Sequence, residues 1–300
     1  MTEKNTSEDT TQETTTAKSP HSMNHPESEP PRQYSDWETW IDTLRVRLEE
    51  QLTIWPEQVQ ERLNLVNPAA STAVPTQGDV LVYIHGYLGE GRVGSLNVSG
   101  ANQAAALRQA LTDEFEDGRE PPTVVAGMWN SSASWPTATR RAEQVGRTLA
   151  DWLTANGDQY DRLTLVGHSL GGRVALIALS CLDRATVDSV GLLGAAVGST
   201  AVRSSYRHGI ETAVDGHVYN YHSVNDFIVC NLYNFREGDD GIGCMGAFLT
   251  RDSSGARTPL PTNYVDVDVS KTVHRHLDYF KPVSTTVAGN CLPQLVANQF

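Results

Sequence analysis

A serine flanked by glycines is the strongest chemical signal in this sequence. Residues 163–176 read LTLVGHSLGGRVAL, which predicts an apolar strand, a Gly-x-Ser-x-Gly turn centred on Ser169, and then a helix. Such a sharp turn holds its serine in a strained conformation with the hydroxyl clear of the sheet. A Cβ two residues to either side would collide with the strand or the helix, so Gly167 and Gly171 suit their positions. We predict Ser169 as a nucleophile; the alternative is a serine that only caps the helix.

This strand, turn and helix resemble those of the α/β-hydrolase superfamily of esterases, lipases and related enzymes. The resemblance covers roughly residue 79 to the C-terminal end. It implies an α/β-hydrolase fold, and the alternation of predicted strands and helices itself predicts a mostly parallel sheet covered on both faces. The superfamily's catalytic order is serine, then an acid, then histidine, each after its own strand.

The acid that fits this order is Asp226. It directly follows a predicted strand over 217–222, whereas Asp215 precedes that strand and Asp239 and Asp240 lie in a Gly-rich loop. Asp226 would fix the tautomer of the histidine and stabilise the imidazolium. The alternative is that it only caps the helix predicted over 227–235.

Two histidines, His274 and His276, follow the last predicted strand, and spacing and strand order leave them tied as the base. The segment DVDVSKTVHRHLDYF, however, resembles the end of an uncharacterised branch of the superfamily, in which a His-x-x-Tyr pattern follows a short strand. On that match His276 and Tyr279 fill the pattern, and His276 is the expected base.

The resemblance also implies an oxyanion hole and a substrate pocket. In the superfamily a His-Gly pair after an early strand supplies one backbone N–H, so the expected donors are the N–H groups of Tyr87 and Leu170, with Leu88 as the alternative to Tyr87. Gly86 would let the backbone approach the substrate.

We expect four residues near these donors to contact the substrate: His85, Gly86, His168 and Trp129. Trp129 and Trp135 follow a predicted strand at 123–128, at the edge where open α/β sheets bind ligands. Each tryptophan either lines an acyl or aromatic pocket or caps the core. His168 is not expected to be the base, because a residue next to the nucleophile on a tight turn points elsewhere.

The composition limits the classes of partner. The net charge is −13, with nineteen arginines but only four lysines. Such an acidic surface predicts a halophilic source and argues against a nucleic-acid or anionic-membrane partner. No apolar run is long enough for a membrane span, no secretory signal pattern is present, and cytoplasmic localisation is expected.

The sequence carries no phosphate-binding loop and no metal-ligand spacing, so neither a cofactor nor a metal is expected. The four cysteines do not suggest a disulfide framework, and Cys181, in a predicted apolar helix, is expected to be a small core residue.

Three regions are expected along the chain: a disordered tail over 1–34, a helical extension and linker over 35–78, and the hydrolase domain over 79–300. The extension would contain an amphipathic helix over 36–55 and a second short helix around Leu63. The loop over 236–261 is expected to be mobile.

The expected function is hydrolysis of a small-molecule carboxylic ester by Ser169, Asp226 and His276 through an acyl-enzyme. The alternatives are a catalytically silent binding or scaffold protein of the same fold, or an acyltransferase that uses the same residues. The sequence does not define the oligomeric state.

Overall fold

The computed structural model describes residues 58–89, 92–93, 96–97, 99–114, 120–248, 250–251 and 257–280. The predicted tail over 1–34 and the amphipathic helix predicted over 36–55 therefore lie outside the described residues.

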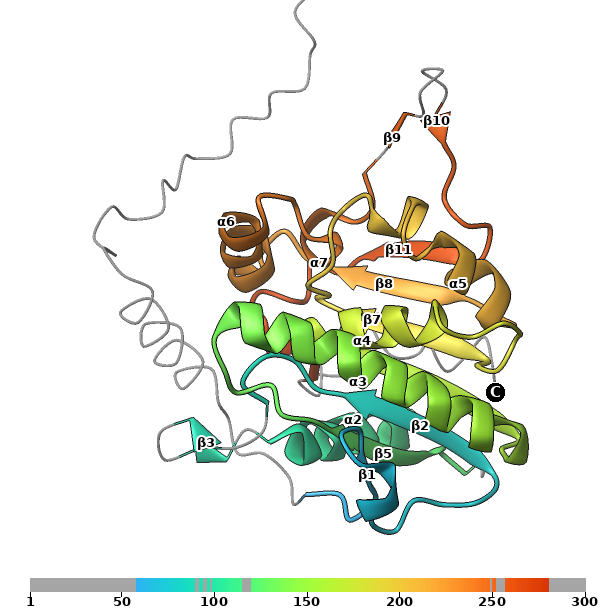
Figure 1. The fold of residues 1–300 in the computed structure, drawn as a ribbon. Helices are drawn as coiled ribbons and strands as arrows, with labels where there is room; N and C mark the ends of the chain where they lie inside the picture. Colours follow the sequence, from blue (N-terminus) through green and yellow to red (C-terminus); the bar gives the residue numbers. More distant parts are fainter. Residues whose placement is uncertain are drawn as a thin grey trace, which may run out of the picture.

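A seven-stranded sheet, parallel at every pairing, forms the centre of the molecule (Figure 1). Its strand order is β1-β5-β2-β6-β7-β8-β11. The strands are rich in buried Val, Leu and Ile, as expected where both faces of a parallel sheet are covered. In chain order they are β1 (Arg62–Asn64), β2 (Asp79–Ile84), β5 (Thr123–Met128), β6 (Arg162–His168), β7 (Ser189–Leu193), β8 (Val218–His222) and β11 (Tyr264–Asp268).

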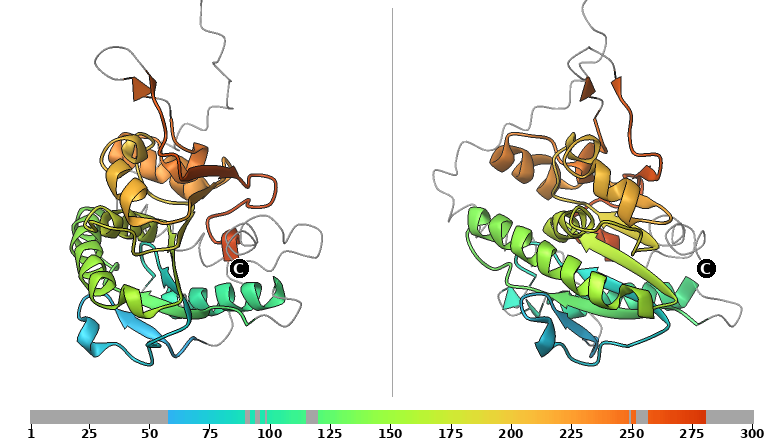
Figure 2. Two further views of the ribbon diagram at one scale, coloured as in Figure 1. Left: turned by 90° about the vertical axis from the view of Figure 1, so that its right-hand side faces the viewer. Right: turned by 45° about the vertical axis from the view of Figure 1, so that its right-hand side comes forward.

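Helices cover the two faces of the sheet and enclose two apolar clusters (Figure 2). Helices α3 (Trp135–Asn156), α4 (Leu170–Leu179) and α5 (Arg207–Ala213) pack on one face. Helix α2 (Gly100–Glu114) and the C-terminal turn η5 (Asp278–Phe280) pack on the other. This arrangement is the α/β-hydrolase fold predicted from the sequence.

The helix expected around Leu63 is wrong, because these residues form strand β1. Leu63 and Leu65 alternate with more exposed neighbours, and this period of two is that of a strand. Leu63 pairs with Gly127 of β5. The sheet therefore includes residues that precede Asp79.

The region after Asp226 is more ordered than the sequence suggested. The predicted helix is present as a π-helical segment, η4 (Ile228–Tyr233), that continues into α6 (Asn234–Glu237). The loop over 236–261 contains α7 (Ile242–Met245), whose Ile242 N–H donates to the Val197 carbonyl at 2.8 Å. Much of this loop is thus fixed against the sheet.

Both expectations about the cysteines are wrong. A disulfide joins Cys230 of η4 to Cys244 of α7. Cys181 lies just beyond the end of α4 and is exposed, so it is not a core residue.

The remaining short elements are η1 (Pro68–Ala70), β3 (Arg92–Val93), β4 (Leu96–Asn97), η2 (Gly157–Gln159), η3 (Ala201–Arg203), β9 (Thr250–Arg251) and β10 (Arg257–Thr258).

No helix in the described part of the chain combines the length and the hydropathy that crossing a membrane requires.

Candidate active site

Ser169 lies at the turn between β6 and α4 and has a backbone conformation that few non-glycine residues adopt. Its φ is 54° and its ψ is −122°. The Ser169 N–H donates to the Leu193 carbonyl at 3.0 Å, and the Ser169 carbonyl accepts the Ala196 N–H at 3.0 Å. Such a conformation costs about 1–3 kcal/mol and persists only where its surroundings enforce it. The β7 end of the sheet therefore holds the serine in the strained turn.

Glycines make this turn possible. A Cβ on Gly167 would lie 2.6 Å from the Gly171 carbonyl oxygen, which is far inside normal contact. A Cβ on Gly86 would lie 2.6 Å from the Ser169 Cβ and 3.1 Å from its Oγ. The backbone at Gly86 therefore passes directly against the serine.

Asp226 and His276 form a buried pair. The His276 Nδ1 lies 2.8 Å from Asp226 Oδ2, and the two side chains are 6% and 0% exposed, respectively. The other carboxylate oxygen accepts the N–H groups of Ile228 at 3.1 Å and Val229 at 3.2 Å. The two roles considered for Asp226 are thus compatible, because one oxygen caps η4 while the other contacts the histidine.

His274 points away from this pair. It is exposed, and its Nδ1 lies 3.5 Å from the Asn225 side-chain amide. The structure thus brings His276, and not His274, to the buried carboxylate.

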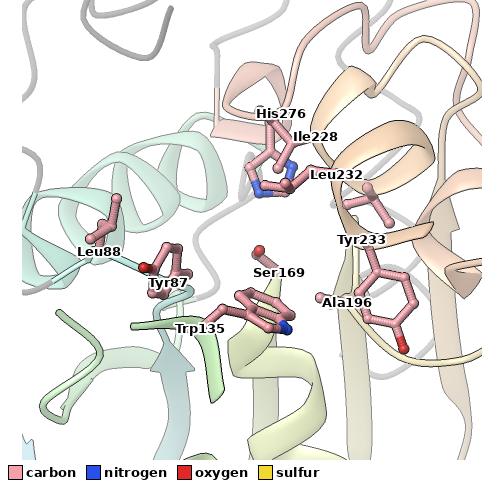
Figure 3. A pocket seen from close by; sticks show the side chains of 10 residues that line it. Tyr87, Leu88, Trp135, Ser169, Ala196, Ile228, Leu232, Tyr233 and His276 are labelled. Carbon is pink, nitrogen blue, oxygen red and sulfur yellow. The ribbon is translucent and has the colours of Figure 1, made fainter. Parts of the chain in front are cut away.

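A small pocket opens beside Ser169, and Figure 3 shows the serine hydroxyl directed toward the His276 ring across it. No hydrogen bond joins these two described side chains in this structure. Such bonds are commonly long in a free enzyme and shorten when substrate binds. The pocket is lined by Tyr87, Leu88, Trp135, Ser169, Ala196, Ile228, Val229, Leu232, Tyr233 and His276.

Of the expected oxyanion donors, Tyr87 and its alternative Leu88 line this pocket, whereas Leu170 directly follows Ser169 and is fully buried. Leu170 is the first residue of α4, so its N–H is one of those that the helix itself cannot satisfy, and the positive end of the helix dipole lies there. Tyr87 follows Gly86, whose backbone contacts Ser169, and Leu88 has a φ of 61°. Two non-glycine residues with positive φ, Ser169 and Leu88, thus face one pocket.

His85 and Trp129 were expected to contact substrate, but the structure places them behind the pocket lining. Their rings stack with centroids 5.6 Å apart, and they are 0% and 2% exposed. The Trp129 indole N–H donates to the His85 carbonyl at 3.0 Å. Burial lowers the pKa of His85 to about 4, so its ring is neutral at neutral pH. These residues support the loop that carries Gly86 and Tyr87.

His168 is also absent from the pocket lining, contrary to expectation. Its Nε2 lies 2.9 Å from the His276 carbonyl oxygen, and the centroids of the two imidazole rings are 4.5 Å apart. Burial, and secondarily the nearby His276, hold the pKa of His168 well below its ordinary value. His168 therefore contacts the backbone of His276 as a neutral ring.

Sequence reasoning missed most of the pocket wall. Ile228 and Leu232, and likewise Val229 and Tyr233, recur at i, i+4 directly after Asp226. This spacing would have indicated a helix with one face toward the site. Trp135 lines the pocket, as one of its two interpretations required, whereas Trp129 does not.

In the described residues, no group of three or more His, Cys, Asp or Glu side chains could hold a metal ion.

Comparison with known families matches residues 127–288, more than half of the chain, to a family described as "Protein of unknown function (DUF726)". A relative in Oryza sativa subsp. japonica, "Transmembrane and coiled-coil domain-containing protein STS1", is 27% identical over 179 residues, which cover 58% of this chain and 25% of the relative. "Uncharacterized membrane protein F35D11.3" of Caenorhabditis elegans is 27% identical over 192 residues, which cover 62% and 29%. The chain thus spans less than a third of the length of these relatives.

Solved structures with some similarity include esterase B from Lactobacillus rhamnosis, with 12% identity, coverage of 87% of this chain and 93% of the other, and a TM-score of 0.45. A Trichoderma reesei cutinase in complex with a phosphonate inhibitor has 21% identity, coverage of 52% and 63%, and a TM-score of 0.30. Values this low carry no conclusion about the reaction or the substrate.

Proposed function

The chain belongs to the family described as "Protein of unknown function (DUF726)", and we propose that it is a serine hydrolase that cleaves carboxylic esters. The observation that carries the proposal is the buried Asp226–His276 pair beside Ser169, which has a strained backbone at the start of a helix. A strained serine, a buried carboxylate and a histidine at one pocket have a common explanation in nucleophilic catalysis.

In the proposed reaction, His276 Nε2 takes the hydroxyl proton of Ser169 while Oγ attacks the ester carbonyl carbon. The N–H groups of Leu170 and Tyr87 stabilise the negative oxygen that forms. Cleavage of the ester C–O bond then releases the alcohol, which receives its proton from His276.

Deacylation follows the same steps with water in place of Ser169. His276 takes a proton from water, the hydroxide attacks the acyl carbon, and the acid leaves as Oγ regains its proton. Asp226 keeps the Nδ1 proton of His276 in place and stabilises the imidazolium in both halves. The reaction needs neither a metal nor a cofactor.

The test is labelling by a fluorophosphonate probe, in molar salt as well as dilute buffer because the charge of −13 favours a salt-stabilised fold. Wild type should label covalently at one site. Ser169→Ala and His276→Ala should lose the label, while His274→Ala should keep it as the matched histidine control. Absence of labelling in folded wild type would contradict the hydrolase proposal and favour the silent binding protein.

Hydrolysis and acyl transfer share the acyl-enzyme and differ only in the acceptor. Release of free acid from p-nitrophenyl acetate at a rate equal to that of nitrophenol supports hydrolysis. A rate that rises steeply with added alcohol or amine, with little free acid formed, would instead support transfer.

Localisation in the cytoplasm stays a prediction. The Cys230–Cys244 disulfide counts against it, because cytosolic thiols are usually kept reduced.

A further inference from the structure

We propose that the pocket beside Ser169 selects esters with a short, uncharged acyl group of about the size of acetyl, and that Trp135 sets this limit. The inference rests on the proposed hydrolase function and goes beyond it by naming the substrate class.

The size of the pocket is the first argument. Its volume is about 30 Å³, and its mouth is open to solvent. Since a cavity needs roughly 10–15 Å³ to hold one water-sized group, this pocket admits about two or three such groups. The carbonyl group that faces Ser169 uses part of that space, so the remaining volume holds about one methyl group, and a longer acyl chain would not fit inside the pocket.

The chemistry of the lining is the second argument. Beside Ser169 and His276, the described lining is aromatic or aliphatic except for two tyrosine hydroxyls. The Tyr87 hydroxyl donates to the Ala133 carbonyl, and the Tyr233 hydroxyl accepts a hydrogen bond from Arg173 at 3.2 Å. Both hydroxyls thus have protein partners, and a charged acyl group would meet no opposite charge in this lining.

Trp135 forms one wall of the pocket. Its side chain lines the pocket together with Ser169, and it lies between the rings of Tyr87 and Tyr233 (Figure 3). Its ring packs edge-on against the rings of Tyr87 and Tyr233, with centroid distances of 5.4 Å and 6.4 Å, respectively. A longer acyl chain could extend in this direction only if the indole moved away.

An ionic network behind the pocket keeps the indole in place. The Trp135 Nε1–H donates to Glu237 Oε1 at 2.6 Å, and Glu237 Oε2 lies 3.5 Å from the Arg173 guanidinium. Hydrogen bonds to charged groups are stronger than neutral ones, so the indole would lose a strong bond by rotating.

The same guanidinium supports two further parts of the wall. Arg173 Nε donates to the Ala196 carbonyl at 3.2 Å, and its Nη2 contacts the Tyr233 hydroxyl. Burial raises the pKa of Tyr233 to about 12, so this hydroxyl stays protonated and neutral. Arg173 and Glu237 therefore act as positioning residues for the pocket wall.

The test is the dependence of kcat/KM on acyl length for p-nitrophenyl acetate, butyrate and octanoate. Wild type should prefer acetate over octanoate by about 100-fold, the scale of discrimination that a poor fit of added methylenes gives. Trp135→Ala should reduce this preference to about 10-fold or less, mainly by raising kcat/KM for octanoate. Trp152→Ala, on the same helix and only partly buried, is the matched control and should keep the wild-type preference.

Two variants at Glu237 test the same wall without removing the Trp135 side chain. Glu237→Leu removes the acceptor of the indole N–H and should also reduce the preference for acetate. Glu237→Gln retains an acceptor oxygen and should keep most of the preference. An equal effect of both variants would contradict the role of the Trp135–Glu237 hydrogen bond.

The outcomes separate the inference from the proposed function. Ser169-dependent hydrolysis of octanoate at or above the acetate rate would overturn the short-acyl inference and leave the hydrolase proposal intact. A preference for acetate that persists unchanged in both Trp135→Ala and Glu237→Leu would overturn the role of Trp135. No turnover of any ester, together with no fluorophosphonate labelling, would overturn the hydrolase proposal itself.

Discussion

Three buried histidines, His85, His168 and His276, lie near Ser169, and their surroundings differ in one respect. His276 contacts the Asp226 carboxylate at 2.8 Å, whereas the hydrogen bonds recorded for His85 and His168 are with backbone groups. Burial beside Ser169 is common to all three. The carboxylate partner is what distinguishes the histidine suited to catalysis from the two that support the fold.

The hydrogen bonds also fix a different proton position on each ring. His85 Nδ1 must donate to the Gly86 carbonyl at 3.0 Å, because its Nε2 accepts the Trp129 N–H at 3.3 Å. His168 Nε2 must donate to the His276 carbonyl. His276 Nδ1 donates to Asp226, which leaves its Nε2 as an acceptor toward Ser169. Of these three histidines, only His276 thus presents a free basic nitrogen to the pocket.

The largest expected effect is the loss of that nitrogen. His276→Ala should lower kcat/KM for p-nitrophenyl acetate by about 10⁴-fold or more, as removal of a general base from a catalytic triad does. His168→Gln keeps an amide donor for the His276 carbonyl and should lose far less. Equal losses in the two variants, with both folded by circular dichroism, would break the distinction between the histidines.

Asp226→Asn should come next, with kcat lower by about 10³- to 10⁴-fold, because a neutral amide no longer favours the Nδ1–H form or the imidazolium. The asparagine oxygen can still accept the N–H groups of Ile228 and Val229, so stability should change little. Thermal unfolding is the control. A large drop in Tm with activity retained per folded molecule would show that Asp226 is only a helix cap.

Removing the disulfide tests how the segment next to Asp226 is stabilised, without altering a histidine. Cys230 lies in the helix that Asp226 caps, and it is 14 positions from Cys244 in the sequence. The double variant Cys230→Ser, Cys244→Ser should lower the free energy of unfolding by about 3 kcal/mol, the value expected for a loop of this length. Urea unfolding measures it, with Cys181→Ser as the control. An unchanged midpoint would contradict a structural role for the bond.

The smallest expected effect concerns the pH dependence of stability due to His85. Its pKa is about 4 in the folded protein against 6.5 for an unperturbed histidine, so the unfolded chain binds a proton more readily between these values. The free energy of unfolding is therefore highest above pH 6.5. It decreases as the pH falls toward 4, by about 2 kcal/mol between pH 7 and pH 5. His168, whose pKa is lowered as well, adds to the decrease.

His85→Gln should reduce this pH dependence, whereas His217→Gln, at an exposed histidine, should not. Urea unfolding at pH 7 and pH 5 gives the comparison. A slope that is the same in wild type and His85→Gln would show that His85 is not buried in a neutral form.

The sequence predicted the features that depend on neighbouring residues. The turn at Ser169 needs glycines at fixed spacing, and the strands on either side are apolar runs, so both could be recognised locally. The position of Asp226 after β8 followed from the order of strands in a parallel sheet. The structure places Ser169 in the pocket lining, and Asp226 contacts another lining residue, His276.

The remaining features depend on contacts between distant segments. Glu237 reaches Trp135 across 102 positions, and Cys230 meets Cys244 only because α7 folds back against η4. His85 and Trp129 end neighbouring strands, as a substrate-binding residue would, but their rings turn into the core and stack. Local patterns do not report the direction in which a side chain at a strand end points.

The most direct test of the difference among the histidines is the tautomer of each ring, measured by long-range proton–nitrogen NMR of the ¹⁵N-labelled protein at neutral pH. We expect the proton of His276 on Nδ1 and that of His168 on Nε2, with single-histidine variants assigning the signals. Loss of the Nδ1–H signal of His276 in Asp226→Asn would support the carboxylate as its cause. A His276 ring with its proton on Nε2, and thus no free nitrogen for Ser169, would contradict its role as the base.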